Sequence, residues 1–180
     1  MDRPVPSALQ LHVSRWFNTP KPIALDELRG KVVAVHTFQM LCPACVAHGL
    51  PQAMRLREAF SADQLAVIGL HTVFEHHPVM GPDALQAFIH EYQLRFPIGV
   101  DEADPHGTVP RTMAAWGLRG TPSLVLLDRY GQARLSHFGR IDDLTLGAVV
   151  GQLLERPYQP EVMADEHVRD GRCDGDACHP

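Results

Sequence analysis

Two cysteines separated by two residues, Cys42 and Cys45, are the side chains of this sequence best suited to chemistry. Their Cys-Pro-Ala-Cys motif follows a β-branched, nearly all-apolar run, 31–38, which predicts a strand buried on both faces. Residues 46–60 after the motif have helical character, so Cys42 is expected where a strand ends and a helix begins. Unpaired amides and the helix dipole at such a position stabilise a thiolate. We therefore predict that Cys42 is a nucleophile and that Cys45, one turn further on, resolves the mixed disulfide it forms.

The same pair of cysteines has a second interpretation as two ligands of a zinc site, which would need two further ligands elsewhere. A chance spacing is a third, but chance does not explain a position between a strand and a helix. The chain has four cysteines in 180 residues, too few for a scaffold built on disulfides. Redox catalysis and metal binding are therefore the two chemistries to weigh.

Composition excludes several classes of protein. The chain is 45% hydrophobic and 21% charged, close to the average of a globular protein, so it is neither collagen-like, disordered nor a coiled coil. A net charge of −5 and no long basic run argue against nucleic acid as a partner. No apolar stretch approaches the roughly 20 residues that span a bilayer, and the first residues lack a signal-peptide pattern. We expect a cytoplasmic protein with no membrane partner, or a periplasmic one if the start is misassigned.

The wider pattern of the chain predicts an α/β fold. Apolar runs alternate with helical segments, which implies a parallel core of strands, and a turn at 129–131 adds a hairpin strand. Apolar density collapses after residue 156, where prolines, glycines and acidic residues predominate. We therefore divide the chain into an N-terminal segment, one domain and a mobile tail, at 1–19, 20–155 and 156–180. The strands are expected at 31–38, 65–72, 96–100, 122–128 and 132–139, and the helices at 46–60, 82–94, 109–118 and 142–154.

Four short motifs, in this order, resemble a known family. They are Gly-Lys-Val-Val-Ala-Val at 30–35, the Cys-Pro-Ala-Cys motif, Gly-Thr-Pro at 120–122 before a strand, and the Asp-Arg-Tyr-Gly turn at 128–131. Together they resemble the redoxin branch of the thioredoxin superfamily, and most closely the TlpA-like thiol-disulfide oxidoreductases with their DipZ-like subgroup. The resemblance covers about residues 20–155. It implies a thioredoxin-like fold, in which a central mixed sheet is flanked by helices.

The resemblance also implies an activity and a substrate clamp. Pro122 matches the cis-proline that faces the active-site cysteines of the family, and Thr121 matches the residue whose backbone pairs with bound substrate as a short strand. An ordinary strand-entry turn is the alternative interpretation of this Thr-Pro pair. The implied reaction is exchange with a protein disulfide or an upstream reductase, and it requires no organic cofactor because the electrons reside on sulfur.

Three positions depart from the family pattern. His36 stands where thioredoxins have a buried aspartate, and its imidazole could accept the proton of Cys45; a buried neutral histidine is the alternative. Glu75 lies near the place where some TlpA-like proteins have an active-site glutamate, although the register differs by about one residue. Pro51 falls one residue later than usual after Cys45, which predicts a local bulge in the helix.

A thiol peroxidase related to the alkyl hydroperoxide reductase and thiol-specific antioxidant group is a rival function. Peroxiredoxins carry a threonine three residues before the reactive cysteine, where this chain has Gln39, so the motif favours disulfide exchange. The tail offers a further set of sulfur and imidazole groups: Cys173, Cys178 and His179. They could relay electrons to Cys42, bind zinc or copper together with or apart from the first pair, or have no role.

Overall fold

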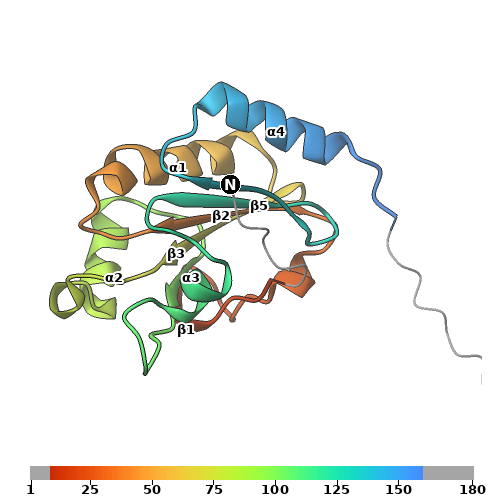
Figure 1. Cartoon of the computed structure of the whole chain (residues 1–180). Coiled ribbons are helices and arrows are strands. Elements are labelled where there is room, and N and C mark those ends of the chain that lie inside the picture. Colours follow the sequence, from red (N-terminus) through yellow and green to blue (C-terminus); the bar gives the residue numbers. More distant parts are fainter. Residues whose placement is uncertain (1–8, 160–180) are drawn as a thin grey trace, which may run out of the picture.

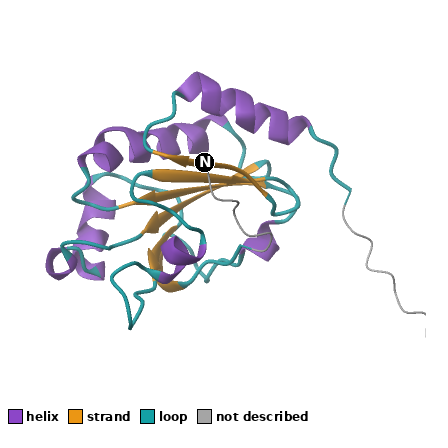
Figure 2. Cartoon of the chain, in the orientation of Figure 1, coloured by secondary structure: helices purple, strands orange, loops and turns teal. Residues whose placement is uncertain are grey.

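The computed structural model describes residues 9–159. Their strands and helices follow each other as the apolar runs of the sequence predict, with a further strand near the N-terminus (Figure 2). The strands are β1 (Val13–Phe17), β2 (Val32–Phe38), β3 (Leu65–His71), β4 (Ile98–Asp101), β5 (Ser123–Leu127) and β6 (Ala133–Phe138). The helices are α1 (Leu50–Ala59), α2 (Pro82–Glu91), α3 (Arg111–Ala115) and α4 (Asp143–Glu155), and three short turns are η1 (Leu25–Leu28), η2 (Cys45–Gly49) and η3 (His77–Val79).

The six strands form one mixed sheet in the order β1-β4-β3-β2-β5-β6. β2, β3 and β4 are parallel, while β5 runs antiparallel to β2 and β6 antiparallel to β5. The expected parallel core is therefore wrong for β5. The reason is the length of α3, whose five residues span only about 7 Å at roughly 1.5 Å per residue. The chain consequently stays at the end of the sheet where β4 finishes, and β5 begins there, with Ser123 opposite Thr37 of β2.

Helices cover both faces of this sheet, so β2 at its centre is buried along its whole length, as predicted. Figure 1 shows α1 and α4 over one face and α3 over the other. Successive side chains of a strand point to opposite faces. Val32 and Ala34 accordingly join the core beneath α1, α2 and α4, while Val33 and Val35 pack with Trp116 just beyond α3. The same alternation places His36 on the α1 face.

β1 is a strand that the sequence analysis does not assign. It pairs antiparallel with β4 at the edge of the sheet, and its register shifts between Val13 and Arg15. The shift breaks the two-residue alternation that marks a strand in a sequence, and all five side chains of β1 are partly buried or exposed. Within residues 9–159, none of the helices is long and apolar enough to cross a membrane.

Candidate active site

Cys42 lies in the loop between β2 and η2, and Cys45 is the first residue of η2, so the predicted strand-to-helix position of the motif is confirmed. Both cysteines are free thiols. The backbone N–H of Cys45 donates to Cys42 Sγ over 3.3 Å, as expected for an otherwise unpaired amide at the start of a helix. Cys42 is partly exposed, whereas Cys45 is fully buried, so only the first sulfur is accessible to another protein.

The helix that carries Cys45 begins with a π-helical turn, η2, in which the Leu50 N–H bonds to the Cys45 carbonyl. This turn contains one residue more than an α-helical turn, and Pro51 follows it at the start of α1. The bulge predicted from the late position of Pro51 is thereby confirmed. It also places Gly49 directly against the cis-proline loop: a Cβ on Gly49 would lie 3.1 Å from the Cβ of Pro122.

The peptide bond between Thr121 and Pro122 is cis, as the resemblance implies. It lies just before β5, and the carbonyl of Pro122 accepts the N–H of Gly139 from the end of β6 over 2.8 Å. The thiol of Cys42 donates to the carbonyl of Thr121, with sulfur and oxygen 3.5 Å apart. Thr121, Pro122 and the two cysteines therefore form one site, although about eighty residues separate the two segments.

Burial raises the pKa of Cys45 to about 12, and the hydrogen bond with Cys42 adds to this effect. Hydrogen bonding from the backbone of Gln39 and from the side chain of Thr121 acts in the opposite direction and lowers this pKa. The second thiol of the motif is thus held protonated, with donors already in place for its thiolate.

His36 is buried on β2, and neither of its ring nitrogens has a hydrogen-bond partner among residues 9–159. Burial lowers the pKa of His36 to about 4, an effect that a weak interaction with Gln52 partly offsets. Nδ1 of the ring lies 3.6 Å from the position of a Cβ on Gly49, one helical turn beyond Cys45. The imidazole is therefore neutral at pH 7 and faces the same helix as the buried thiol.

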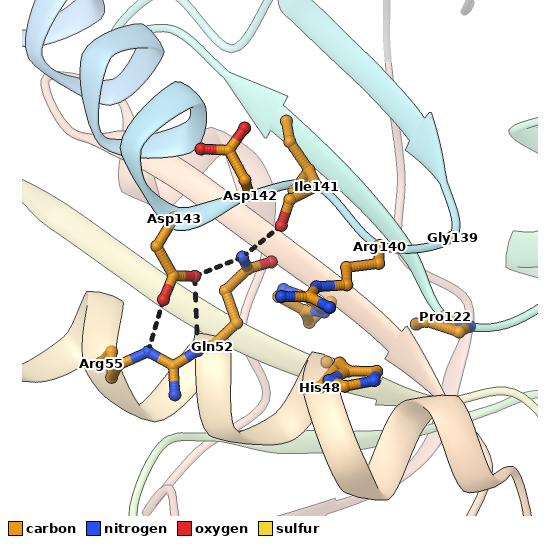
Figure 3. A pocket seen from close by; sticks show the side chains of 11 residues that line it. His48, Gln52, Arg55, Pro122, Gly139, Arg140, Ile141, Asp142 and Asp143 are labelled. Carbon is orange, nitrogen blue, oxygen red and sulfur yellow. Dashed lines mark hydrogen bonds and ion pairs between the residues drawn. The ribbon is translucent and has the colours of Figure 1, made fainter.

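The His36 ring lines a cavity of about 90 Å³ between η2, α1 and the segment that joins β6 to α4. Figure 3 shows its far wall, where Gln52 bonds the Ile141 carbonyl over 2.9 Å and Asp143 over 2.7 Å. Arg55 pairs with the same Asp143 at 2.9 Å. The cavity is large enough for several water molecules and is lined by the polar groups that water needs.

Glu75 lies on the exposed loop after β3, and the structure brings it to the site through one intermediate, Gln39. The Gln39 amide nitrogen lies 3.4 Å from a carboxylate oxygen of Glu75 and 3.5 Å from the hydroxyl of Thr121. Sequence reasoning treated Gln39 only as a residue that argues against a peroxidase. Its position near the end of a buried strand, three residues before Cys42, was the available signal for a role in the site.

The structure gives no support to a metal site within residues 9–159, where no three metal-ligating side chains come together. His71, at the end of β3, is buried against the ring of Phe38, and His77 is exposed. The proposed tail ligands or relay groups Cys173, Cys178 and His179 lie outside the described residues.

Solved structures similar to this one include thioredoxin-like proteins and a thiol-disulfide isomerase. A thioredoxin-like superfamily protein is 50% identical, with a TM-score of 0.83 over 85% of this chain and 99% of that one. A thiol-disulfide isomerase from Corynebacterium glutamicum is 46% identical, with a TM-score of 0.81 over 85% of this chain and 98% of that one. A thioredoxin-like protein in its oxidised form, 22% identical with a TM-score of 0.66 over 84% of this chain and 95% of that one, shares the fold.

No family model matches the chain, and no curated protein matches it. The two structures at 50% and 46% identity are covered almost from end to end, so the similarity extends over the whole described fold and the site within it. The TlpA-like subgroup and the antioxidant activity stay predictions. The chain belongs to the thioredoxin-like superfamily and is a thiol-disulfide oxidoreductase.

Proposed function

We propose that Cys42 and Cys45 are the dithiol of this oxidoreductase and that they exchange with disulfides of other proteins. One observation carries the assignment: the partly exposed Cys42 sulfur lies between the N–H of Cys45 and the carbonyl of Thr121. An N–H donor stabilises negative charge on that sulfur, as a nucleophilic thiolate requires. The buried Cys45 is out of reach of a second protein but within reach of Cys42.

The reaction then follows in two steps. The thiolate of Cys42 attacks a sulfur of the substrate disulfide, so a bond from Cys42 to that sulfur forms, the substrate S–S bond breaks, and the other sulfur leaves and takes a proton. Cys45 next loses its proton and attacks Cys42 Sγ, which releases the second substrate sulfur, also to be protonated. Two electrons pass to the substrate, and the enzyme is left with a Cys42–Cys45 disulfide for an upstream reductase to reduce.

Thr121 and Pro122 are the proposed substrate clamp. The carbonyl of Thr121 already faces the Cys42 sulfur, so a substrate strand that pairs with this backbone would bring its own sulfur to the nucleophile. Leu41, immediately before Cys42, is 57% exposed and provides an apolar surface beside the clamp. An extended, partly apolar segment around a cysteine is therefore the substrate chemistry that fits.

His36 is the proposed route for the proton of Cys45. Its neutral imidazole has a lone pair to accept a proton. Because the pKa of His36 is about 4 and that of Cys45 about 12, the ring holds the proton only in passing, and the transfer depends on its onward loss to water. The adjoining cavity, with room for water, leads that proton away from the buried thiol. His36 acts in this scheme as a relay between Cys45 and the cavity.

The experiment is to trap the mixed disulfide. In a chain that carries Cys173→Ser and Cys178→Ser, the further change Cys45→Ser should leave a stable adduct of Cys42 with a disulfide-containing protein such as insulin. The matched variant, Cys42→Ser with Cys45 intact, should form no adduct and reduce no disulfide, because the remaining thiol is buried. An adduct on Cys45, or turnover by the Cys42→Ser variant, would overturn the assignment of roles.

A further inference from the structure

The side chain of Gln39 is a buried polar group that has no role in the two steps of disulfide exchange described above. It is 1% exposed and lies where β2 leads into the Cys42 loop. Its Oε1 accepts the backbone N–H of Phe74 over 3.3 Å, and its Nε2 faces both Glu75 and Thr121. Gln39 thereby connects the three loops that surround the cysteines.

The orientation of this amide is fixed by the chemistry of its partners. A backbone N–H can only donate, so Phe74 requires the amide oxygen on its side. The carboxylate of Glu75 accepts from the opposite, nitrogen side. Nε2 then has one N–H for Glu75 and one for the hydroxyl oxygen of Thr121.

This orientation decides what the hydroxyl of Thr121 can do. A hydroxyl has one proton to donate, and when its oxygen accepts from Gln39 that proton is free for another acceptor. Thr121 lies at the cysteine pair, with its carbonyl 3.5 Å from Cys42 Sγ, and hydrogen bonding from its side chain lowers the pKa of Cys45, the buried thiol that must become a nucleophile in the second step. Hydrogen bonding from the backbone of Gln39 lowers the same pKa.

We propose that Gln39 is a positioning residue for the resolving step, which directs the hydroxyl of Thr121 to donate to the thiolate of Cys45. The proposal rests on the function proposed above, in which Cys45 resolves the mixed disulfide. The proton of Cys45 leaves toward His36, and the electron pair of its sulfur forms the bond to Cys42. The bond between Cys42 and the substrate breaks, and the substrate sulfur departs with its electron pair and is protonated. The O–H of Thr121 stabilises the negative charge on Cys45 between these events.

The test measures resolution separately from attack. A rapid single turnover with a small aromatic disulfide that releases a coloured thiol gives one burst for attack by Cys42 and a second for resolution by Cys45. Gln39→Met preserves the size of the side chain and removes both N–H donors. We expect the second burst to slow about tenfold, as for the loss of a hydrogen bond to a charged group, and its pH midpoint to rise by about one unit, while the first burst is unchanged.

A double-mutant cycle separates positioning from a structural effect. Thr121→Val removes the hydroxyl, so adding Gln39→Met to it should slow the second burst no further. Thr121→Ser retains the hydroxyl and should keep the sensitivity to Gln39→Met. Gln39→Glu, a second variant with no N–H to give, should shift the pH midpoint in the same direction. Gln86→Leu, on the exposed side of α2, is the control and should change neither burst.

Two results would overturn the proposal. One is a second burst in Gln39→Met with the rate and pH midpoint of the unchanged protein. The other is a slower burst with an unchanged midpoint whose effect adds to that of Thr121→Val. Failure of the proposed function gives a different result, because the unchanged protein would then show no burst from Cys42.

Discussion

The two ends of the central strands are built in different ways. At the end where β2 finishes, the cysteines, the cis-proline loop and Gln39 meet, and their contacts join residues far apart in the chain. At the other end, where β5 turns into β6, one buried carboxylate organises the turn. Asp128 accepts the N–H groups of Tyr130 and Gln132 at 2.9 and 3.0 Å, and Arg134 pairs with it at 2.5 Å.

The buried polar side chains at the two ends differ in how far along the chain their partners lie. The side-chain hydrogen bonds of Asp128 reach no further than six residues along the chain. Those of Gln39 reach Glu75, 36 residues away, and Thr121, 82 residues away. Four of the five buried side-chain nitrogens without a partner within residues 9–159 belong to His36 and His71, both near the active-site end; the fifth is Nε of Arg129 at the turn. The two buried histidines without partners thus lie toward the active-site end, whereas the buried carboxylate at the turn, Asp128, is ion-paired with Arg134.

The largest expected effect concerns pH and the two buried histidines. Burial lowers the pKa of both His36 and His71 to about 4, whereas an unfolded chain has the usual value of 6.5. The unfolded state therefore binds protons first as pH falls, so stability is full above pH 6.5 and declines between pH 6.5 and 4, by about 3 kcal/mol for each histidine. Denaturant unfolding across this range measures the decline.

Single substitutions test whether the buried histidines cause this loss of stability at low pH. His71→Leu should remove about half of it, and His77→Gln, at an exposed position, should leave it unchanged. A decline of equal size in the His71→Leu protein would mean that the unpartnered histidine does not produce the difference between the two ends.

The second prediction tests the turn end. Asp128→Ala leaves two turn N–H groups and the Arg134 guanidinium without their acceptor, and should lower the free energy of unfolding by about 2 kcal/mol. The rate of disulfide exchange per folded molecule should not change, because the turn lies at the far end of β5 from Cys42. A large loss of exchange rate in a protein that remains folded would show that the two ends are coupled.

The smallest expected effects come from two helical glycines. A Cβ on Gly49 would meet Pro122 at 3.1 Å, whereas a Cβ on Gly151 of α4 would have no neighbour within 4 Å. Gly151→Ala should raise stability by about 0.5 to 1 kcal/mol through helix propensity. In Gly49→Ala the close contact with Pro122 should outweigh the gain in helix propensity and lower the free energy of unfolding by about 1 kcal/mol. The same contact should displace the clamp and slow disulfide exchange. An equal rise in the free energy of unfolding from both alanine substitutions would show that the Thr121–Pro122 loop moves without cost and would contradict this prediction.

The elements that could be predicted from the sequence are those whose characteristic residues lie within one short stretch of the chain. The runs that became β2, β3 and β5 were recognisable because buried central strands are almost continuously apolar. The Asp-Arg-Tyr-Gly turn carried a local signal of its own, because the hydrogen bonds of the Asp128 side chain close within six residues. β1 was missed because its register shift removes the alternation.

Site residues that belong to a short sequence motif could be predicted, whereas contacts between loops distant in the sequence could not. Cys42, Cys45 and the Thr121–Pro122 pair could be named from short motifs in order along the chain. The antiparallel direction of β5 could not, because it follows from the short α3. Gln39 could not be assigned a partner either, since Phe74, Glu75 and Thr121 come from other loops, and one sequence does not specify how these loops meet.

The most direct test of the account is a redox titration of the full chain in glutathione buffers, with thiols alkylated and all four cysteines read by mass spectrometry. The account predicts a reversible disulfide between Cys42 and Cys45 with a single midpoint, unchanged when Cys173 and Cys178 are replaced by serine. It would be contradicted if Cys42 and Cys45 remained thiols throughout the titration, or if Cys42 were oxidised only in pairing with a tail cysteine.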